Sequence, residues 1–238
     1  NIIYFNSTAE DFLKSRTVNH ADIIYIDPSR RKKGNQKVFS LNQTEPDVAA
    51  LQPLIWDISH NLLVKASPLL DIQQALTDLE FVKQVSIISI RGECKELLLS
   101  CKNLFRSEPV VTAIHLNDEH FKFSFHISDE RKAEVKYHDP LQFLYEPNAS
   151  LLKGGCFKLV GSNYNLFKLH PNTHLYTSAN LSDDFPGRIF QIDSFLKFNQ
   201  KQIRLAFQDG KANILTRNYP SCVDEIRKKT NLKDGGSK

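Results

Sequence analysis

The sequence predicts an α/β fold, in which a mostly parallel sheet with an antiparallel end is followed by small α+β modules. Short apolar segments alternate with helical patterns up to about residue 101, and an alternating pair of strands follows. A charged segment without a strong apolar pattern, Ser128 to Lys136, then separates these elements from the rest. We therefore expect a first domain at 1–129, a linker at 130–137 and two small modules at 138–183 and 184–238.

The first clear strand is the isoleucine-rich segment Ala21 to Ile26. It is short and does not alternate, which is typical of a parallel strand buried on both faces. The strand ends abruptly in Asp27-Pro28, followed by Ser29, Arg30 and Arg31. Ligands of open α/β sheets bind beyond the carboxyl ends of the strands, so Asp27 is the first candidate functional residue. The alternative is that Asp-Pro opens an ordinary turn.

The next elements continue the α/β pattern. Thr44 to Asp47 predicts a helix start, and apolar residues at helical spacing run to Ile58, with a break or kink at Pro53. A buried strand is expected at Asn61 to Ala66. Ser67-Pro68 then predicts an N-cap and a first-turn proline for a helix whose apolar stripe is Leu69, Ile72, Leu76 and Leu79.

A second group of elements closes the predicted sheet. We expect a strand at Phe81 to Ile90, a helix at Glu93 to Cys101, and an antiparallel hairpin formed by Val110 to Leu116 and Phe121 to Ile127. Phenylalanines alternate with polar residues in the last strand, which indicates one buried face. Further on, we expect a short helix opened by Asn148, strands at 188–192 and 211–216, and a final helix at 221–230 with Ser221 as its N-cap.

The segment Asp27-Pro28-Ser29-Arg30 resembles the fourth motif of class I S-adenosylmethionine (SAM)-dependent methyltransferases, Asn/Asp-Pro-Pro-aromatic or Asp-Pro-Pro-Arg. Over its whole length the chain resembles the C-terminal part of a Bacteroidetes-type class I methyltransferase with a THUMP-like C-terminal domain. The other segments that carry this resemblance are Lys65-Ala66-Ser67-Pro68-Leu69-Leu70-Asp71, Glu93-Cys94-Lys95-Glu96-Leu97, Tyr145-Glu146-Pro147-Asn148-Ala149, Phe185-Pro186-Gly187-Arg188, Arg217-Asn218-Tyr219-Pro220 and Asp234-Gly235-Gly236. The resemblance implies a partial Rossmann-like sheet, a ferredoxin-like module at 138–183 and a THUMP-like basic module at 184–238.

The resemblance also implies a reaction, SAM-dependent methylation of a base nitrogen in a structured tRNA or rRNA. Asp27 and the carbonyl that leads into Pro28 give two acceptors in fixed geometry, suited to an exocyclic amine. Arg30 would stack on the base or bind its phosphate. Because Ser29 replaces a proline and the aromatic residue is missing, the rival interpretation is a non-catalytic RNA-binding protein on a degenerate methyltransferase scaffold.

The glycine-rich turn that holds SAM in this class is not found in the sequence, because none of the nine glycines forms a G-x-G pattern. We therefore expect the chain to start near the third strand of the sheet, with Asn1 to Asn6 as that strand, and to lack a terminal strand after Lys238. The turn from Ser7 to Asp11 would then contact the adenine ring of SAM through Thr8, Ala9 and Glu10. This piece alone is expected to bind SAM poorly.

The positive charge is concentrated at the C-terminal end. The net charge is +4, and residues 186–238 hold 11 Lys/Arg against 5 Asp/Glu, which leaves −2 for the other residues. Such a segment suits a phosphate backbone, or forms a solvated helix face at Arg227-Lys228-Lys229. The candidate RNA contacts are Arg31, Lys32, Lys33, Lys65 and Arg217. For Lys65, a salt-bridged lysine is the equal alternative.

Other classes of site are disfavoured. The sequence has no stretch of about 18 apolar residues, so no membrane span is predicted. The four cysteines form no CxxC pair, which favours a reduced, cytoplasmic setting; they are Cys94, Cys101, Cys156 and Cys222. His170 and His174 flank a loop with Pro171, so we expect no metal site. Methylation at pyrimidine C5 needs a nucleophilic cysteine, and the methyltransferases that this chain resembles and that carry out such methylation have it after the fifth strand, where this chain has Lys65-Ala66-Ser67-Pro68. Cys94 is therefore expected to be structural, which favours N-methylation.

Overall fold

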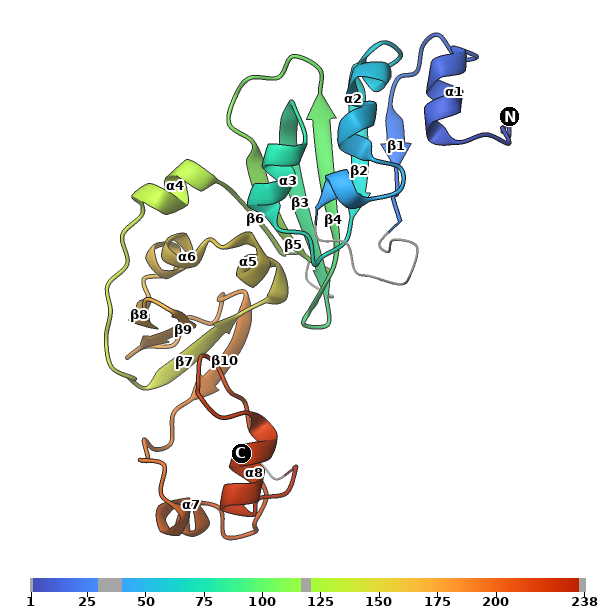
Figure 1. The fold of residues 1–238 in the computed structure, drawn as a ribbon. Coiled ribbons are helices and arrows are strands. Elements are labelled where there is room, and N and C mark those ends of the chain that lie inside the picture. Colours follow the sequence, from blue (N-terminus) through green and yellow to red (C-terminus); the bar gives the residue numbers. More distant parts are fainter. Residues whose placement is uncertain (1, 30–39, 117–120, 236–238) are drawn as a thin grey trace. The chain divides into compact units, whose positions relative to one another are not determined.

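The computed structural model describes residues 2–29, 40–116 and 121–235 (Figure 1). The chain divides into two compact units, Asn1–Ala133 with Asn148–Phe157 and Glu134–Pro147 with Lys158–Lys238, and each is described by itself. A six-stranded mixed sheet lies in the first unit and a four-stranded sheet in the second, so the predicted α/β class with accessory α+β modules is confirmed. Within the described ranges, no helix is long and apolar enough to cross a membrane.

The sheet of the first unit has the order β1-β2-β4-β3-β5-β6. Its strands are β1 (Ile24–Ile26), β2 (Asn61–Ala66), β3 (Val82–Ile90), β4 (Glu93–Lys102), β5 (Val110–His115) and β6 (Phe121–His126). β1 pairs with β2 in parallel, and β3 with β5 in parallel. β4 pairs with both β2 and β3 in the antiparallel sense, so it folds back from β3 and inserts between them. β5 and β6 form the predicted antiparallel end of the sheet.

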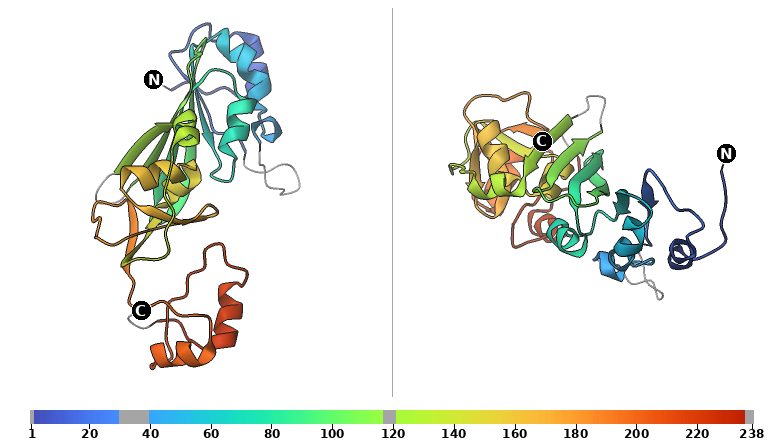
Figure 2. Two further views of the ribbon diagram at one scale, coloured as in Figure 1. Left: turned by 90° about the vertical axis from the view of Figure 1, so that its left-hand side faces the viewer. Right: turned by 90° about the horizontal axis from the view of Figure 1, so that it is seen from above.

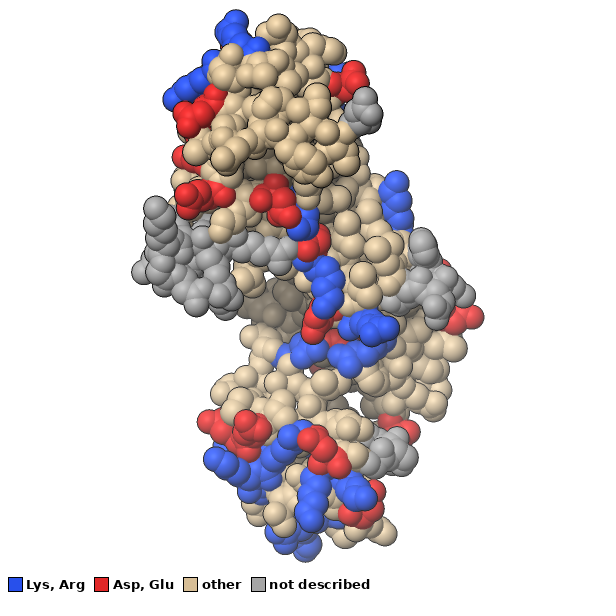
Figure 3. All heavy atoms as spheres, turned by 90° about the vertical axis from the view of Figure 1, so that its right-hand side faces the viewer, with Lys and Arg blue, Asp and Glu red and all other residues tan. Residues whose placement is uncertain are grey.

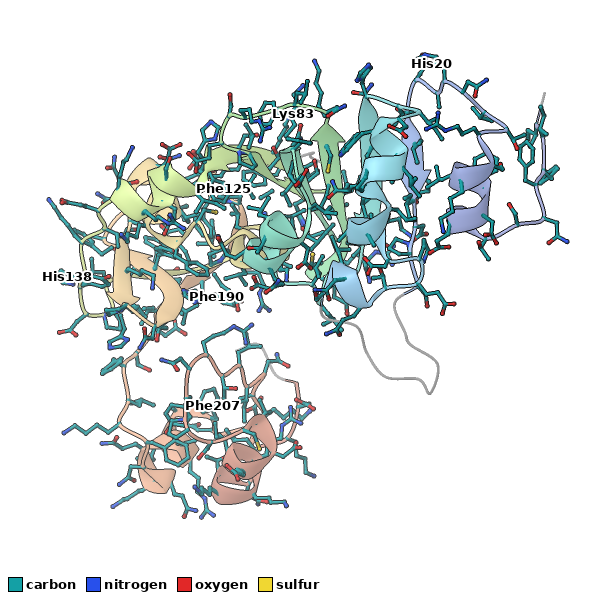
Figure 4. The ribbon with its side chains drawn as sticks, turned by 45° about the horizontal axis from the view of Figure 1, so that its top comes forward. His20, Lys83, Phe125, His138, Phe190 and Phe207 are labelled. Atoms are coloured by element: carbon teal, nitrogen blue, oxygen red, sulfur yellow. The ribbon has the colours of Figure 1, made fainter. Side chains whose placement is uncertain are left out.

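Helices cover one face of this sheet. The helices of this unit are α1 (Ala9–Ser15), the 3-10 helix η1 (Leu41–Gln43), α2 (Val48–Trp56), α3 (Ile72–Asp78), α4 (Ile127–Lys132) and α5 (Ala149–Gly154). α2 and α3 lie on the same side of the sheet (Figure 2), and Leu51 and Ile55 of α2 are buried there. α5 packs on β3, β4 and β5, where Gly154 lies against the ring of Phe125, labelled in Figure 4. The core of the first unit lies on this face, and burial of each large apolar side chain there stabilises the fold by about 1.5–3 kcal/mol.

The helix predicted at Glu93 to Cys101 is wrong, because these residues form strand β4. Arg91 and Gly92 have φ values of 50° and 80° and form a two-residue turn, whose backbone twist suits a hairpin. Leu97, Leu99 and Cys101 are buried on one face of β4. Glutamate, lysine and leucine favour helices, but pairing with a strand on each side outweighs that local preference.

Strand β1 is parallel to β2 as predicted, but the expected burial on both of its faces is wrong. It is the edge strand of the sheet, and Ile23 and Tyr25 are each 54% exposed. The strand predicted at Asn1 to Asn6 is also wrong for its described residues, which form no strand, and Ile2 and Ile3 are more than 70% exposed. Without that neighbour, nothing among the described residues pairs with the outer edge of β1.

The predicted start of α2 is confirmed, whereas its predicted break, the start of α3 and the linker differ from the structure. α2 begins after Asp47, whose side chain accepts the Ala50 N–H at 3.0 Å, and it continues through Pro53 without the predicted break. α3 begins after Asp71, which accepts the Gln74 N–H at 2.9 Å. Ser67 was expected as that N-cap, but its carbonyl accepts from Leu70 in a separate turn. Helix α4 extends into the charged segment that was expected as a linker.

The second unit is built on an antiparallel sheet of order β10-β7-β9-β8. Its elements are β7 (Phe143–Pro147), α6 (Phe157–Asn163), β8 (Phe167–His170), β9 (Thr173–Ser178), β10 (Gly187–Gln191), α7 (Gln200–Ala206) and α8 (Val223–Thr230). The core contains Tyr145 and Tyr176, both fully buried, and their ring centroids lie 5.1 and 6.4 Å from that of Phe185.

The predictions for the C-terminal half are confirmed in part. Asn148 caps α5 by accepting the Leu151 N–H at 3.0 Å, and the strand predicted at 188–192 is β10. The final helix is α8, with Cys222 rather than Ser221 as its N-cap. The strand predicted at 211–216 is wrong, because among the described residues this segment makes one isolated bridge, between Lys211 and Lys233, and pairs with no strand.

Substitution of Gly187 by alanine should destabilise the second unit by about 3 kcal/mol, the upper end of what overpacking usually costs. A Cβ at this position would lie 2.1 Å from the backbone carbonyl oxygen of Glu146 in β7, and a backbone atom cannot move aside as a side chain can. Urea unfolding measures the loss. Gly154→Ala is the control, because its Cβ would meet side-chain atoms, the flexible Ile87 methyl at 3.2 Å and the Phe125 ring at an ordinary contact distance of 3.5 Å. Equal stability of the two variants would contradict this packing argument.

Candidate active site

The motif residues meet where the two parallel strands end. Ile26 of β1 pairs with Val64 of β2, so the next residues, Asp27 and Lys65, lie side by side. The Lys65 ammonium donates a hydrogen bond to Asp27 Oδ2 at 2.7 Å. Asp27 and Lys65 are both predicted site residues, and the structure brings them together. Of the two roles open to Lys65, the salt bridge is observed.

Glu96 of β4 is the third charged group, and its carboxylate oxygen Oε1 lies 3.9 Å from Lys65 Nζ. The hydrogen bond to Asp27 raises the pKa of Lys65 above its ordinary value, with a smaller contribution from Glu96, so the ammonium stays protonated at neutral pH. The side chains of Asp27, Lys65 and Glu96 are 44, 27 and 28% exposed. An ion pair so accessible adds little to stability, but a ligand can reach it.

Pro28 fixes the backbone on the other side of the motif. It is buried, and the next residue, Ser29, donates its N–H to the Glu45 carbonyl at 2.9 Å. A small pocket lies here, lined by Pro28, Ser29, Ser40, Leu41, Thr44, Ala66, Ser67 and Leu70. Ala66 and Lys65 are adjacent in β2 and point to opposite faces. The pocket and the ion pair therefore lie on opposite sides of one sheet edge.

Cys94 lies apart from the charged cluster. The register shifts between the pairs Ile88–Glu96 and Ser89–Cys94, which turns Cys94 to the face opposite Glu96. Burial raises the pKa of the Cys94 thiol, and the pKa values of Cys101 and Cys156 are raised to about 12. A buried thiol of raised pKa is a poor nucleophile. These observations support the structural role expected for Cys94.

The other predicted site residues are placed as follows. Arg30, Arg31, Lys32 and Lys33 lie outside the described residues. Thr8 is the N-cap of α1 and accepts the Asp11 N–H at 3.1 Å, and Ala9 and Glu10 form the first turn of this helix, which packs on α2. The sequence contains no G-x-G turn. The glycine-rich turn expected to hold the methionine end of SAM is therefore not found in this sequence, and the adenine contacts of Thr8, Ala9 and Glu10 stay a prediction.

Arg217, predicted to contact RNA, binds a carboxylate of its own chain. Its guanidinium pairs with Glu146 Oε1, and that of Arg188 pairs with Glu146 Oε2. The Glu146 side chain is 6% exposed, whereas the two arginine side chains are about half exposed. Asn218 Nδ2 also donates to Thr173 Oγ1 at 3.4 Å. Glu146, which pairs with both arginines, was not among the site residues predicted from the sequence.

The C-terminal helices carry charges of both signs. Figure 3 shows lysine and arginine side chains interspersed with acidic ones at its lower end, where α7 and α8 lie. The last turn of α8 holds Arg227, Lys228 and Lys229, and Arg227 pairs with Asp234. In the described part of the chain, no group of three or more His, Cys, Asp or Glu side chains could hold a metal.

Comparisons with known proteins agree with this architecture. Residues 143–186 match a family model described as a ferredoxin-like domain, and residues 187–238 match one described as THUMP domain-like. A crystal structure of a protein from Porphyromonas gingivalis W83, described as a putative methyltransferase, superposes with a TM-score of 0.84 at 32% sequence identity. The match covers 95% of this chain and 57% of that chain. Comparison with curated proteins gave no match.

These findings confirm the resemblance stated from the sequence. The C-terminal part has ferredoxin-like and THUMP-like domains, and nearly the whole chain is similar to a methyltransferase-type structure from a Bacteroidetes species. The two family models meet at residues 186 and 187. The predicted domain boundaries, at 129 and at 183, stay predictions.

Proposed function

We propose that the full-length protein is a SAM-dependent methyltransferase of the cytoplasm that methylates an exocyclic amine of a base in structured RNA, a tRNA or rRNA. The observation that carries the proposal is the carboxylate of Asp27 at the carboxyl end of β1, held by Lys65 from the end of the parallel strand β2. Similarity to a methyltransferase-type structure and the THUMP-like match support it.

The residues of the site suit methyl transfer to nitrogen. When bound by the full-length protein, SAM supplies an electrophilic methyl group. Asp27 accepts an N–H of the target amine, which orients the nitrogen lone pair, and Lys65 holds the carboxylate in one position. Pro28 restricts the backbone beside it. Direct displacement needs this alignment more than a strong base, and the amine proton then passes to Asp27 or to water.

The C-terminal module supplies the means to dock RNA. Its excess of six positive charges over residues 186–238 would release counterions from a phosphate backbone. The same charge suits the rival function, a non-catalytic RNA-binding protein. Ser29 favours this alternative, because it stands where the methyltransferase motif has a proline.

Incubation of the full-length protein with radiolabelled SAM and total RNA from a strain that lacks the gene tests the proposal. Label is expected in one ribosomal or transfer RNA band. SAM binding without label in RNA would rule out an RNA substrate. Neither SAM binding nor label, with RNA still bound, would favour the non-catalytic function.

A further inference from the structure

The charged cluster at the end of β1 and β2 places a hydrogen-bond donor beside an acceptor. Lys65 Nζ and Asp27 Oδ2 are 2.7 Å apart. A carboxylate has a second oxygen, and an ammonium has three N–H bonds, of which one points to Asp27 Oδ2. Both groups therefore keep the capacity to bind one more partner while they remain bound to each other.

Because Lys65 is protonated, it can act toward a ligand only as a hydrogen-bond donor. Carboxylate oxygens of Asp27, which follows β1, and of Glu96 in β4 lie 2.7 and 3.9 Å from Lys65 Nζ, and β1 and β4 are the strands on either side of β2. Two carboxylates around one ammonium favour the charged form, and a charged lysine donates hydrogen bonds but accepts none. Beside the Asp27 acceptor the cluster therefore offers a ligand the Lys65 donor, whereas the Glu96 acceptor comes from β4, on the other side of β2.

Bases differ in whether they complement such a pair. Adenine presents its N6 amine beside N1 or N7, and cytosine presents its N4 amine beside N3, so each has a donor next to an acceptor. On the Watson–Crick edge of guanine, the N2 amine lies beside N1–H, which is a second donor. Its other neighbour, N3, lies beside the ribose. Uracil has no exocyclic amine.

We propose that Lys65 selects the base, so that the substrate is an unpaired adenine or cytosine whose amine binds Asp27 and whose neighbouring ring nitrogen accepts from Lys65. This inference depends on the proposed function and narrows its substrate class. It makes Lys65 a substrate contact in addition to the partner of Asp27. The partial exposure of the pair leaves both groups accessible to a base that is turned out of its stack.

The first test identifies the methylated nucleoside. RNA labelled by the full-length protein is digested to nucleosides and analysed by mass spectrometry. N6-methyladenosine or N4-methylcytidine is the expected product. A methyl group on guanine, on uracil, on a carbon or on ribose would overturn the base selection and leave RNA methylation standing. Absence of any methylated nucleoside would remove both.

The second test separates base contact from simple support of Asp27. An oligonucleotide substrate in which the acceptor nitrogen is replaced by C–H (1-deaza- or 7-deazaadenine, or 3-deazacytosine) should lower kcat/KM of the wild type about 10- to 100-fold, the cost of one lost base contact. Lys65→Met should be slowed on both substrates, because Asp27 loses its partner, but replacing the natural substrate by the analogue should cost this variant little, since the contact with the ring nitrogen is already lost.

Two measurements complete this cycle. Lys95→Met is the matched control, since Lys95 forms an exposed pair with Glu93 in the same sheet. Its kcat/KM on each of the two substrates should equal that of the wild type. Binding of the two oligonucleotides, measured by fluorescence anisotropy without SAM, should show the same coupling. If every analogue costs the wild type and Lys65→Met equally, Lys65 does not contact the base and the inference fails.

Discussion

Replacing Asp27 with alanine should lower methyl transfer by the full-length protein at least about 100-fold, the cost that misalignment of reacting groups commonly carries. The carboxylate is the group that orients the amine, and alanine offers no acceptor. SAM affinity should stay within about twofold of the wild type, since Asp27 acts on the substrate amine. Single-turnover assays with labelled SAM measure the first quantity and equilibrium dialysis the second.

Two further variants make this result specific. Asp27→Asn retains one side-chain acceptor and matches the alternative residue of the motif, so it should lose less activity than Asp27→Ala. Asp22→Ala is the matched control, because this aspartate precedes the same strand and its side chain is fully exposed. Unchanged turnover of Asp27→Ala would show that the carboxylate does not orient the amine.

The sequence predicted the site best where it depended on strand ends. Asp27 and Lys65 each follow an apolar segment, and both strands are parallel, so their carboxyl ends meet at one edge. Glu96 was missed because its segment has the composition of a helix. Its place beside Lys65 depends on the turn at Arg91-Gly92, which sends β4 back between β2 and β3.

Glu146 was missed for another reason. A glutamate in a short apolar segment gives no local signal of its partners, and both arginines come from much later in the chain. The pairing of Glu146 with Arg188 follows from the register of β7 and β10. Pairing with Arg217 depends on the path of an irregular segment, which no periodic pattern encodes. Long-range charge pairs of this kind become visible only in the folded chain.

The largest stability effect is expected when both of these arginines are replaced. Arg188→Met and Arg217→Met together would leave the buried Glu146 carboxylate without a cation, which costs about 3–5 kcal/mol in comparable buried pairs. Each single variant should cost much less than half of that, since the remaining guanidinium still compensates the charge. The two effects should therefore be more than additive. Urea unfolding followed by far-UV circular dichroism measures the free energy of unfolding of all three variants.

The same cluster joins the two regions matched by family models, since Glu146 belongs to the ferredoxin-like match and both arginines to the THUMP-like match. Adding Glu146→Met to the double variant should recover much of the lost stability, because it removes the uncompensated charge. Arg16→Met is the control, as its pair with Asp57 is exposed and should be worth less than about 1 kcal/mol. If the double variant is no less stable than this control, Glu146 does not depend on its arginines, and another interaction must hold the start of the basic module against the sheet.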